Sequence, residues 1–172
     1  YIPTAFQGLS RYGPFRDIPD TLYAIWQKSL FEQFPDLILK EHPGQAKFLT
    51  EIYSPPTSEI IYDEFHKCLD KVDVFMFDFI STASSIAAAT NKPIIYFNIG
   101  LRNLTPMAEE LWKRRCIWID VNPERPGNLR EIVESYNENV CMNDFTKSFC
   151  LRAHDADSSR TDIIIKTINE LL

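Results

Sequence analysis

The amino-acid sequence predicts an α/β fold with a parallel β-sheet, and three observations indicate it. Short apolar runs alternate along the chain with segments whose apolar residues recur at helical spacing, which is the rhythm of strands joined by helices. The run at residues 72–77 is almost continuously apolar, as is typical of a parallel strand that is buried on both faces. The 172 residues are 45% hydrophobic, which suits one domain with a continuous core.

The first part of the chain is expected to hold one helix and one short strand. An apolar segment at residues 1–3 is followed by a loop over 4–19. Apolar residues three and four positions apart predict a helix over 20–34 with Asp20 as its N-cap, and a proline ends it. Three consecutive apolar residues at 37–39 predict a short strand.

The middle of the chain leads to the buried strand. Two adjacent prolines favour a loop over 52–57, and Asp63 is expected to cap a helix that runs through residue 69. The buried strand then ends in a hydroxyl-rich turn over 81–85, which precedes a helix over 86–90.

The last part of the chain continues the alternation. Apolar, β-branched residues predict a strand over 94–97, and Thr105 is expected to cap a helix that reaches residue 115. The remaining elements are a strand over 117–119, a helix from Pro126 through residue 136 and an amphipathic helix over 161–172. The succession predicts a Rossmann-like parallel sheet with helices on both faces, formed by a single domain over residues 1–172.

Composition and glycine spacing exclude several classes of protein. Twenty-four acidic and 18 basic residues give a formal net charge of −6, which argues against a nucleic-acid-binding module. No apolar stretch approaches the roughly 20 residues of a membrane span. The five glycines cannot form the dinucleotide-binding GxGxxG motif, and Pro14 follows Gly13 where a P-loop requires lysine.

The cysteines indicate a reducing compartment. The four cysteines form no CxxC pair, and no second ligand pair accompanies His66 and Cys68, so the sequence predicts no zinc site. Free thiols are typical of the cytoplasm, where we expect the protein to be located. Because the chain begins at Tyr1 with neither an initiator Met nor a signal-peptide pattern, we interpret it as a piece of a longer protein.

Hydroxyl side chains follow the buried strand, at the edge of the sheet where ligands bind in such folds. Ser81, Thr82, Ser84 and Ser85 lie there together. Hydroxyls and unpaired backbone N–H groups at a helix start can bind a phosphate. One hydroxyl is enough for ordinary N-capping, which is the alternative interpretation of this turn.

A histidine follows another predicted strand. His42 can donate a hydrogen bond to a phosphoryl oxygen, and Pro43 keeps the preceding residue extended. A single loop histidine such as His42 is usually an ordinary surface residue. Its pairing with the hydroxyl-rich turn makes it a candidate ligand contact. A phospho-receiver domain with Asp78 as phosphoacceptor is disfavoured, because no acidic pair follows the first strand to hold Mg²⁺.

The order of these features resembles the carboxy-terminal half of GT-B glycosyltransferases of surface-polysaccharide synthesis. The most similar branch comprises bacterial sialyltransferases, capsule transferases and CDP-glycerol glycerophosphotransferases. Residues 39–43 are similar to the HP motif of that family. Residues 73–82, with the Lys-Pro pair and the strand that follow, are similar to its serine motif, and the family's serine pair falls on Ser81 and Thr82. Residues 1–4 and 157–172 are similar to the beginning and the end of that half.

The resemblance implies that this chain binds the donor of a transferase, a nucleotide sugar or a CDP-linked polyol. His42 and the hydroxyls of Ser81 and Thr82 would contact the donor phosphate, with Ser84 and Ser85 sharing that role. Glu109 would reach a ribose or sugar hydroxyl, although a solvated helix start also accounts for an acid there. The family requires no metal or other cofactor for this contact.

The other half of such an enzyme would bind the glycan acceptor and supply the general base. We therefore expect the isolated chain to bind nucleotide weakly and to transfer nothing. Peripheral association with the inner face of a membrane would also come from that other half. Two alternatives stay open, a non-catalytic Rossmann-like binding or scaffold module and a nucleotide-sugar 2-epimerase-like domain. The epimerase would require UDP rather than a cytidine nucleotide.

Overall fold

The computed structural model describes residues 1–4, 18–42 and 59–135. The loop predicted over 52–57, Pro43 and the helix predicted over 161–172 lie outside the described residues. The elements in chain order are α1 (Asp20–Gln33), β1 (Ile38–Lys40), β2 (Glu59–Ile61), the 3₁₀-helix η1 (Phe65–Lys71), β3 (Phe75–Phe77), α3 (Thr82–Ala88), β4 (Ile94–Asn98), α4 (Pro106–Arg115), β5 (Ile117–Asp120) and α5 (Leu129–Ser135).

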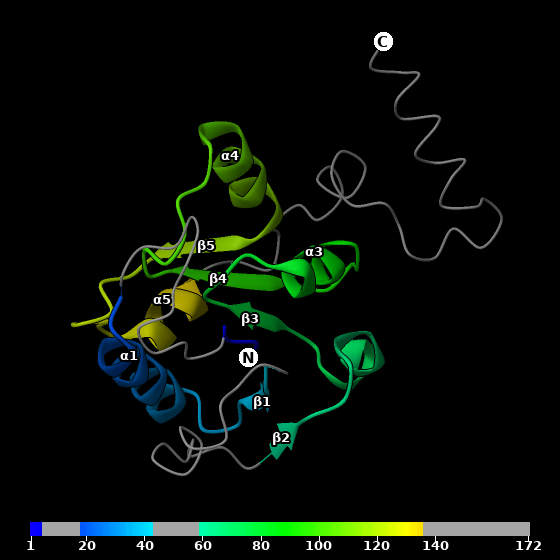
Figure 1. Ribbon diagram of the computed structural model, residues 1–172, viewed down its shortest axis with the longest axis horizontal. Coiled ribbons are helices and arrows are strands. Elements are labelled where there is room, and N and C mark those ends of the chain that lie inside the picture. The colour runs from blue at the N-terminus through cyan, green and yellow to red at the C-terminus, as the bar shows by residue number, and fades with distance from the viewer. Residues whose placement is uncertain (5–17, 43–58, 136–172) are drawn as a thin grey trace, which may run out of the picture.

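Tyr1 and Ile2 join two sets of parallel strands into one sheet. β1 pairs with β2, and β4 pairs with both β3 and β5, always in parallel. The backbone nitrogen of Tyr1 donates to the Ile38 carbonyl at 2.6 Å, and the Lys40 nitrogen donates to the Tyr1 carbonyl at 2.9 Å. On the other side, Ile2 donates to Met76 at 2.9 Å and forms a parallel bridge with Phe77. Across the sheet the order is β2, β1, residues 1–2, β3, β4, β5 (Figure 1).

Numbered along the chain, with residues 1–2 as the first strand, this order is 3-2-1-4-5-6. In a sheet of this order the direction of winding reverses between strands 1 and 4. Here that reversal lies between residues 1–2 and β3. The α/β prediction with a parallel sheet is confirmed.

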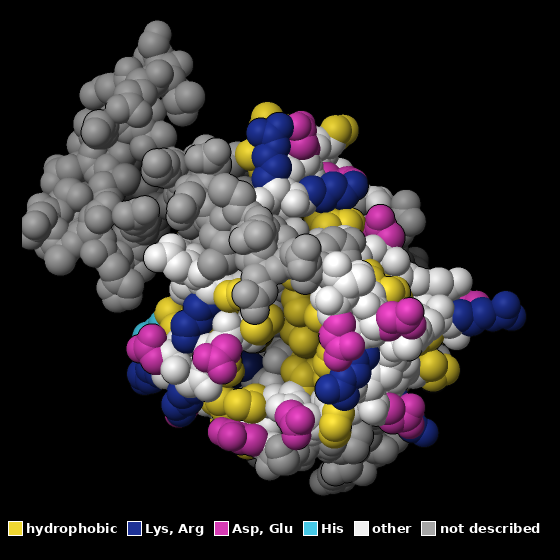
Figure 2. Space-filling view, turned by 180° about the vertical axis from the view of Figure 1, so that it is seen from behind, with side chains coloured by type: hydrophobic (Ala, Val, Ile, Leu, Met, Phe, Trp, Pro, Cys, Tyr) yellow, Lys and Arg dark blue, Asp and Glu magenta, His cyan; other side chains and the backbone are white. Residues whose placement is uncertain are grey.

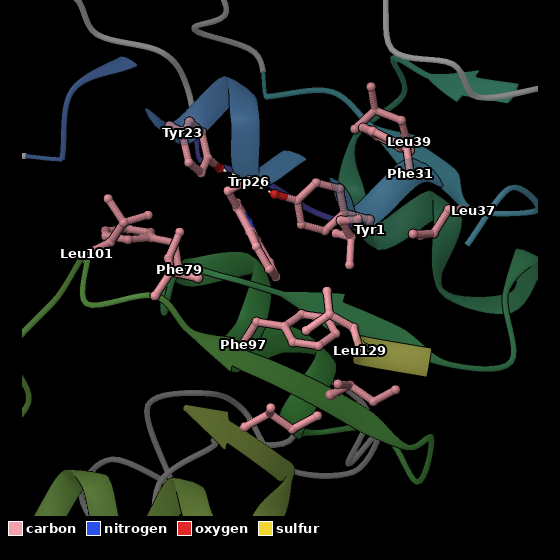
Figure 3. Packing of buried hydrophobic residues seen from close by; sticks show 14 of the residues in the cluster. Tyr1, Tyr23, Trp26, Phe31, Leu37, Leu39, Phe79, Phe97, Leu101 and Leu129 are labelled. Atoms are coloured by element: carbon pink, nitrogen blue, oxygen red, sulfur yellow. Dashed lines mark hydrogen bonds between the residues drawn. The ribbon is translucent and has the colours of Figure 1, made fainter. Parts of the chain in front are cut away.

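Helices cover both faces of the sheet, as predicted. Successive side chains of β4 point to opposite faces, so Ile95 and Phe97 pack in one buried cluster and Ile94 and Tyr96 in another. The first cluster includes side chains of α1 and α5, and the second includes side chains of η1, α3 and α4. Trp26 of α1 packs edge-to-face on Phe97, with ring centroids 5.3 Å apart (Figure 3).

α1 begins at the predicted residue but has a different N-cap, and two other helices begin elsewhere than the sequence predicts. Pro19, not Asp20, is the N-cap of α1, and Asp20 lies in the first turn. The hydroxyl-rich segment is not a turn before a helix, because α3 already begins at Thr82. α5 begins at Leu129 rather than Pro126, since Gly127 has a φ of +70°, a left-handed conformation that a helix cannot include.

The strands and η1 also depart from the predicted bounds. β3 begins at Phe75, and the preceding Asp73 and Val74 are exposed. β2 was not predicted, and β1 lies one residue later than the predicted strand. Glu64, not Asp63, precedes η1 as its N-cap. The predicted cap of α4 is confirmed, because the Thr105 Oγ1 accepts a hydrogen bond from the Ala108 nitrogen at 3.4 Å.

Two basic side chains hold the amino edge of the sheet. Lys92 Nζ donates to the carbonyl oxygens of Leu69 and Val72 at 2.7 and 2.6 Å, which ties the end of η1 to the start of β4. Arg115 is 1% exposed, and its guanidinium donates to four carbonyl oxygens in the segment from α3 to β4. The Lys-Pro pair that follows the serine motif therefore has a structural role at the edge opposite the candidate site.

Candidate functional site

The carboxyl edge of the sheet brings the predicted site segments together. Residues 1–2 lie between β1 and β3, so the segments that follow these three strands leave from the same edge. By register, Thr4 lies between His42 and Phe79. His42 and the loop after β3 are thus separated by two strand spacings, roughly 10 Å. A ligand the size of a nucleotide can span that distance.

The hydroxyl segment divides into capping and accessible side chains. Ser84 is 1% exposed, and its Oγ accepts from the Ser81 nitrogen and donates to the Ser81 carbonyl, both at 2.8 Å. Ser85 Oγ donates to the same carbonyl at 3.2 Å. The bond from the Ser81 nitrogen to Ser84 Oγ belongs to a capping box that Ser81 and Ser84 form at the start of α3. Ser81 is partly exposed, and Thr82 and Ser85 are exposed. Ser81 and Thr82, the pair expected from the serine motif, can therefore reach a ligand, as can Ser85, whereas the buried Ser84 cannot.

His42 lies two residues beyond the end of β1 and is largely exposed. Partial desolvation, followed by the charge of Lys40, lowers the pKa of His42 below its usual value of 6.5. The imidazole is therefore mainly neutral at pH 7, a form that donates one hydrogen bond. A neutral His42 can donate a hydrogen bond to a phosphate but cannot attract it as a positive charge.

Asp78, the residue after β3, forms a buried polar cluster with the side chains of Tyr1 and of Tyr23 and Trp26 in α1. It is completely buried and accepts hydrogen bonds from the hydroxyl of Tyr1, from the hydroxyl of Tyr23 at 3.2 Å and from Trp26 Nε1 at 2.9 Å. The Tyr23 hydroxyl also contacts the backbone of Thr4. A carboxylate enclosed in this way is inaccessible to a phosphoryl donor, which removes the receiver-domain alternative.

The same cluster predicts a pH-dependent stability. Burial raises the pKa of Asp78 from 3.8 to about 6, although hydrogen bonds from Tyr1, Trp26 and Tyr23 act in the opposite direction. Burial also raises the pKa values of Tyr1 and Tyr23, so both phenols stay neutral throughout this range. Because the folded state binds the Asp78 proton more tightly than the unfolded state, stability from this group is greatest below pH 4 and is lost as the pH rises to about 6.

Urea denaturation at pH 4, 5, 6 and 7 measures this effect. Relative to an Asp78→Asn variant, which has no proton to lose, we expect the free energy of unfolding of the wild type to fall by about 2 to 3 kcal/mol across the range. A relative rise with pH would contradict the prediction and show that the three donors outweigh the cost of burying the charge.

Arg102 was missed by the sequence analysis and lies beside the hydroxyl segment. Gly100 has a φ of +81° after β4, and this left-handed turn directs the chain back toward β3. The Arg102 Nη1 donates to the carbonyl oxygen of Ile80 at 2.5 Å, and its guanidinium carbon lies 5.6 Å from the centroid of the Phe79 ring. No motif predicts this contact, because it depends on the path of the chain after β4.

A second polar group lies at the ends of β4 and β5. Asp120 Oδ1 accepts from Asn98 Nδ2 at 2.7 Å and from Trp118 Nε1 at 3.0 Å. Partial burial raises the pKa of Asp120, but the hydrogen bonds from Asn98 and Trp118 and the charge of Lys113 outweigh burial and lower it. Asp120 is therefore ionised at neutral pH and oriented by its neighbours.

Glu109 forms an ion pair within its own helix. Its Oε1 pairs with Lys113 Nζ at 2.5 Å, one turn further along α4, and the Lys113 ammonium lies 5.3 Å from the Trp118 ring centroid. Glu110 pairs in the same way with Arg114. The solvated-helix interpretation accounts for this arrangement better than the predicted ribose contact does.

Within residues 1–4, 18–42 and 59–135, no three His, Cys, Asp or Glu side chains are grouped so as to hold a metal ion. In that same part of the chain, the helices are too short or too polar to cross a membrane. Cys68 and Cys116 are buried free thiols, and burial raises the pKa of Cys116 to about 12. His66 is exposed beside Glu64, so it does not form a ligand pair with the buried Cys68.

Figure 2 shows acidic and basic side chains interspersed over one face of the molecule, with hydrophobic side chains gathered in a hollow near its centre. On this face, Lys and Arg side chains stand apart from one another and do not form an extended basic surface.

Comparison of the chain with protein-family models, with curated proteins and with solved structures finds no match. The functional conclusion therefore rests on the residues and the geometry of this chain.

Proposed function

We propose that this chain is the donor-nucleotide-binding half of a GT-B glycosyltransferase or glycerophosphotransferase that acts on a surface glycan. The observation that carries the proposal is the insertion of residues 1–2 between β1 and β3. This insertion produces the strand order whose reversal point opens a ligand crevice at the carboxyl edge. The residues at that edge, His42 and Ser81 with Thr82, are those that the HP and serine motifs of the family would place on a donor phosphate.

Each contact has a distinct chemical role in this proposal. The neutral His42 donates a hydrogen bond to a phosphoryl oxygen. Ser81 caps α3 through its lone pairs and keeps its hydroxyl proton to donate, and the exposed Thr82 offers a second hydroxyl. Donors fixed around the phosphate stabilise the negative charge that develops as the nucleotide leaves, which lowers the barrier to transfer. Ser84 is buried and serves α3 itself, Ser85 is exposed and can add a further hydroxyl, and Glu109 is not among the proposed contacts.

The donor in this proposal is linked to CMP or CDP and is a sugar or a polyol phosphate. The glycan acceptor, the general base and any association with the inner face of a membrane belong to another half of the enzyme. The chain alone is then expected to bind nucleotide without transferring the donor group.

Calorimetric titration of the chain with CMP, CDP, UDP and GDP tests the proposal. We expect cytidine nucleotides to bind best, and His42→Ala and Ser81→Ala each to weaken binding about tenfold, because each removes one hydrogen bond to a charged oxygen. The matched controls are His66→Ala and Ser135→Ala, which remove the same side chains from exposed positions on η1 and α5 and leave binding unchanged.

The other outcomes favour the alternatives. A preference for UDP would favour a nucleotide-sugar 2-epimerase-like domain. Absence of binding to all four nucleotides at millimolar concentration would contradict the proposal and favour a non-catalytic module. Transfer of a sugar to an acceptor by the chain alone would contradict the assignment of the general base to another half.

A further inference from the structure

Arg102 is fixed against the loop that precedes the hydroxyl segment. Its Nη1 donates to the Ile80 carbonyl at 2.5 Å, and its guanidinium lies over the Phe79 ring. Because Ile80 immediately precedes Ser81, this contact holds the positive charge of Arg102 at the backbone that leads into the hydroxyl segment. The side chain of Arg102 is only partly buried, so it remains within reach of a ligand.

The described part of the chain gives Arg102 no carboxylate partner. The acidic groups nearest along the carboxyl edge are engaged elsewhere, Asp78 with Tyr1, Tyr23 and Trp26 and Asp120 with Asn98 and Trp118. Apart from the bond to Ile80 and the contact with Phe79, Arg102 makes no hydrogen bond or ion pair within the described residues. A guanidinium has five N–H donors, and a single donor is used here.

A positioned guanidinium with unused donors matches one class of ligand. Its planar fork binds two oxygens of a phosphate at once, and such charge-assisted bonds are about twice as strong as neutral ones. We propose that Arg102 binds the phosphate group of the nucleotide at Ser81, which makes it a specificity-determining residue for phosphorylated ligands over nucleosides. The inference rests on the proposed function, because it places the phosphate at Ser81.

A structural role for Arg102 makes a different prediction. If Arg102 only clamps the loop of Phe79 and Ile80, its removal would disturb the site as a whole and weaken all ligands alike. If it binds the phosphate, its removal weakens a nucleotide and spares the corresponding nucleoside. Arg102→Lys keeps the charge and loses the planar fork, so it separates the electrostatic contribution from the bidentate one.

The experiment titrates wild type, Arg102→Ala, Arg102→Lys and Arg130→Ala with CDP, cytidine and inorganic pyrophosphate. Arg130 is an exposed arginine of α5 paired with Glu134, and it serves as the matched control. We expect Arg102→Ala to weaken CDP about 10- to 100-fold and to leave cytidine unchanged, Arg102→Lys to be intermediate and Arg130→Ala to match wild type. Circular dichroism of each variant checks that the fold is retained.

The controls separate failure of this inference from failure of the proposed function. Equal weakening of CDP and cytidine by Arg102→Ala, or no weakening of either, overturns the role of Arg102 while the nucleotide site stands. If wild type binds neither CDP nor cytidine, the proposed function fails and pyrophosphate decides the inference. Binding of pyrophosphate that is lost in Arg102→Ala then supports Arg102 as an anion contact, and no binding overturns it.

Discussion

Replacing Asp78 by alanine is expected to lower the free energy of unfolding by about 3 kcal/mol. The substitution removes the acceptor of the Tyr1 hydroxyl and of Trp26 Nε1 in a fully buried cluster, and it leaves the Tyr23 hydroxyl with the Thr4 carbonyl alone, at 3.3 Å. Each unpaired buried donor costs about 1 to 3 kcal/mol. Two effects reduce the sum, because the Tyr1 and Tyr23 oxygens lie 3.5 Å apart and can pair with each other, and because a buried charge is removed.

Urea denaturation at pH 7 measures this loss, with Asp73→Ala as the matched control. Asp73 is an exposed aspartate just before β3, and its replacement should change stability by less than about 0.5 kcal/mol. Equal stabilities of the Asp78→Ala and Asp73→Ala variants would contradict the prediction. That result would mean that the donors around Asp78 find other acceptors without cost.

Replacing Arg115 by alanine is expected to lower the free energy of unfolding by about 4 kcal/mol or to prevent folding. The Arg115 guanidinium donates to the carbonyl oxygens of Ala88, Thr90 and Lys92 at 3.1, 2.8 and 3.0 Å, and to that of Ala87 at 3.4 Å. These carbonyls end α3 and lead into β4. The Ala87 carbonyl also accepts from the Thr90 nitrogen at 3.0 Å and from Thr90 Oγ1 at 2.7 Å, so the loss of Arg115 falls mainly on the carbonyls of Ala88, Thr90 and Lys92. Truncation also leaves a cavity, because the side chain is 1% exposed.

Arg114→Ala provides the control for this prediction from the neighbouring position. Arg114 is exposed and pairs only with Glu110 among the described residues, so its loss should cost less than about 1 kcal/mol. Arg115→Lys should lose most of the Arg115 contribution, since one ammonium group cannot reach carbonyls on several sides. Thermal unfolding followed by circular dichroism measures all three variants, and similar melting temperatures for Arg114→Ala and Arg115→Ala would disprove the role of Arg115.

The sequence predicts the parallel sheet well where hydrophobic pattern decides the structure. β4 and β5 are short apolar runs that pair in the middle and at the edge of the sheet, and both lie within a residue of the predicted bounds. β3 is shorter than its apolar run, because its pairing with β4 begins only at Phe75 and the preceding Val74 is exposed. β2 carries too short an apolar run to be distinguished from a loop by pattern alone.

The sequence predicts which segments lie at the candidate site, but it does not predict the side-chain contacts within it. The sequence places His42 and Ser81 after strands, and the sheet brings those strand ends to one edge. It cannot assign the Ser84 hydroxyl to capping or show that Asp78 is enclosed by side chains from residue 1 and α1. Arg102 is likewise invisible in the sequence, since its position depends on a left-handed turn at Gly100 and on a loop from another strand.

The central position of residues 1–2 has a consequence for how the sheet assembles. α3 joins β3 to β4, and α4 joins β4 to β5, so these strands pair across short stretches of chain. Residues 1–2, by contrast, pair with β1 and β3, which come much later in the chain. Closing such long loops costs entropy before any contact repays it. Until this first segment docks, β1 and β3 each present an unpaired strand edge, the kind of surface through which partly folded chains associate. The segment that joins the two sets of strands thus also covers the two strand edges through which partly folded chains would associate.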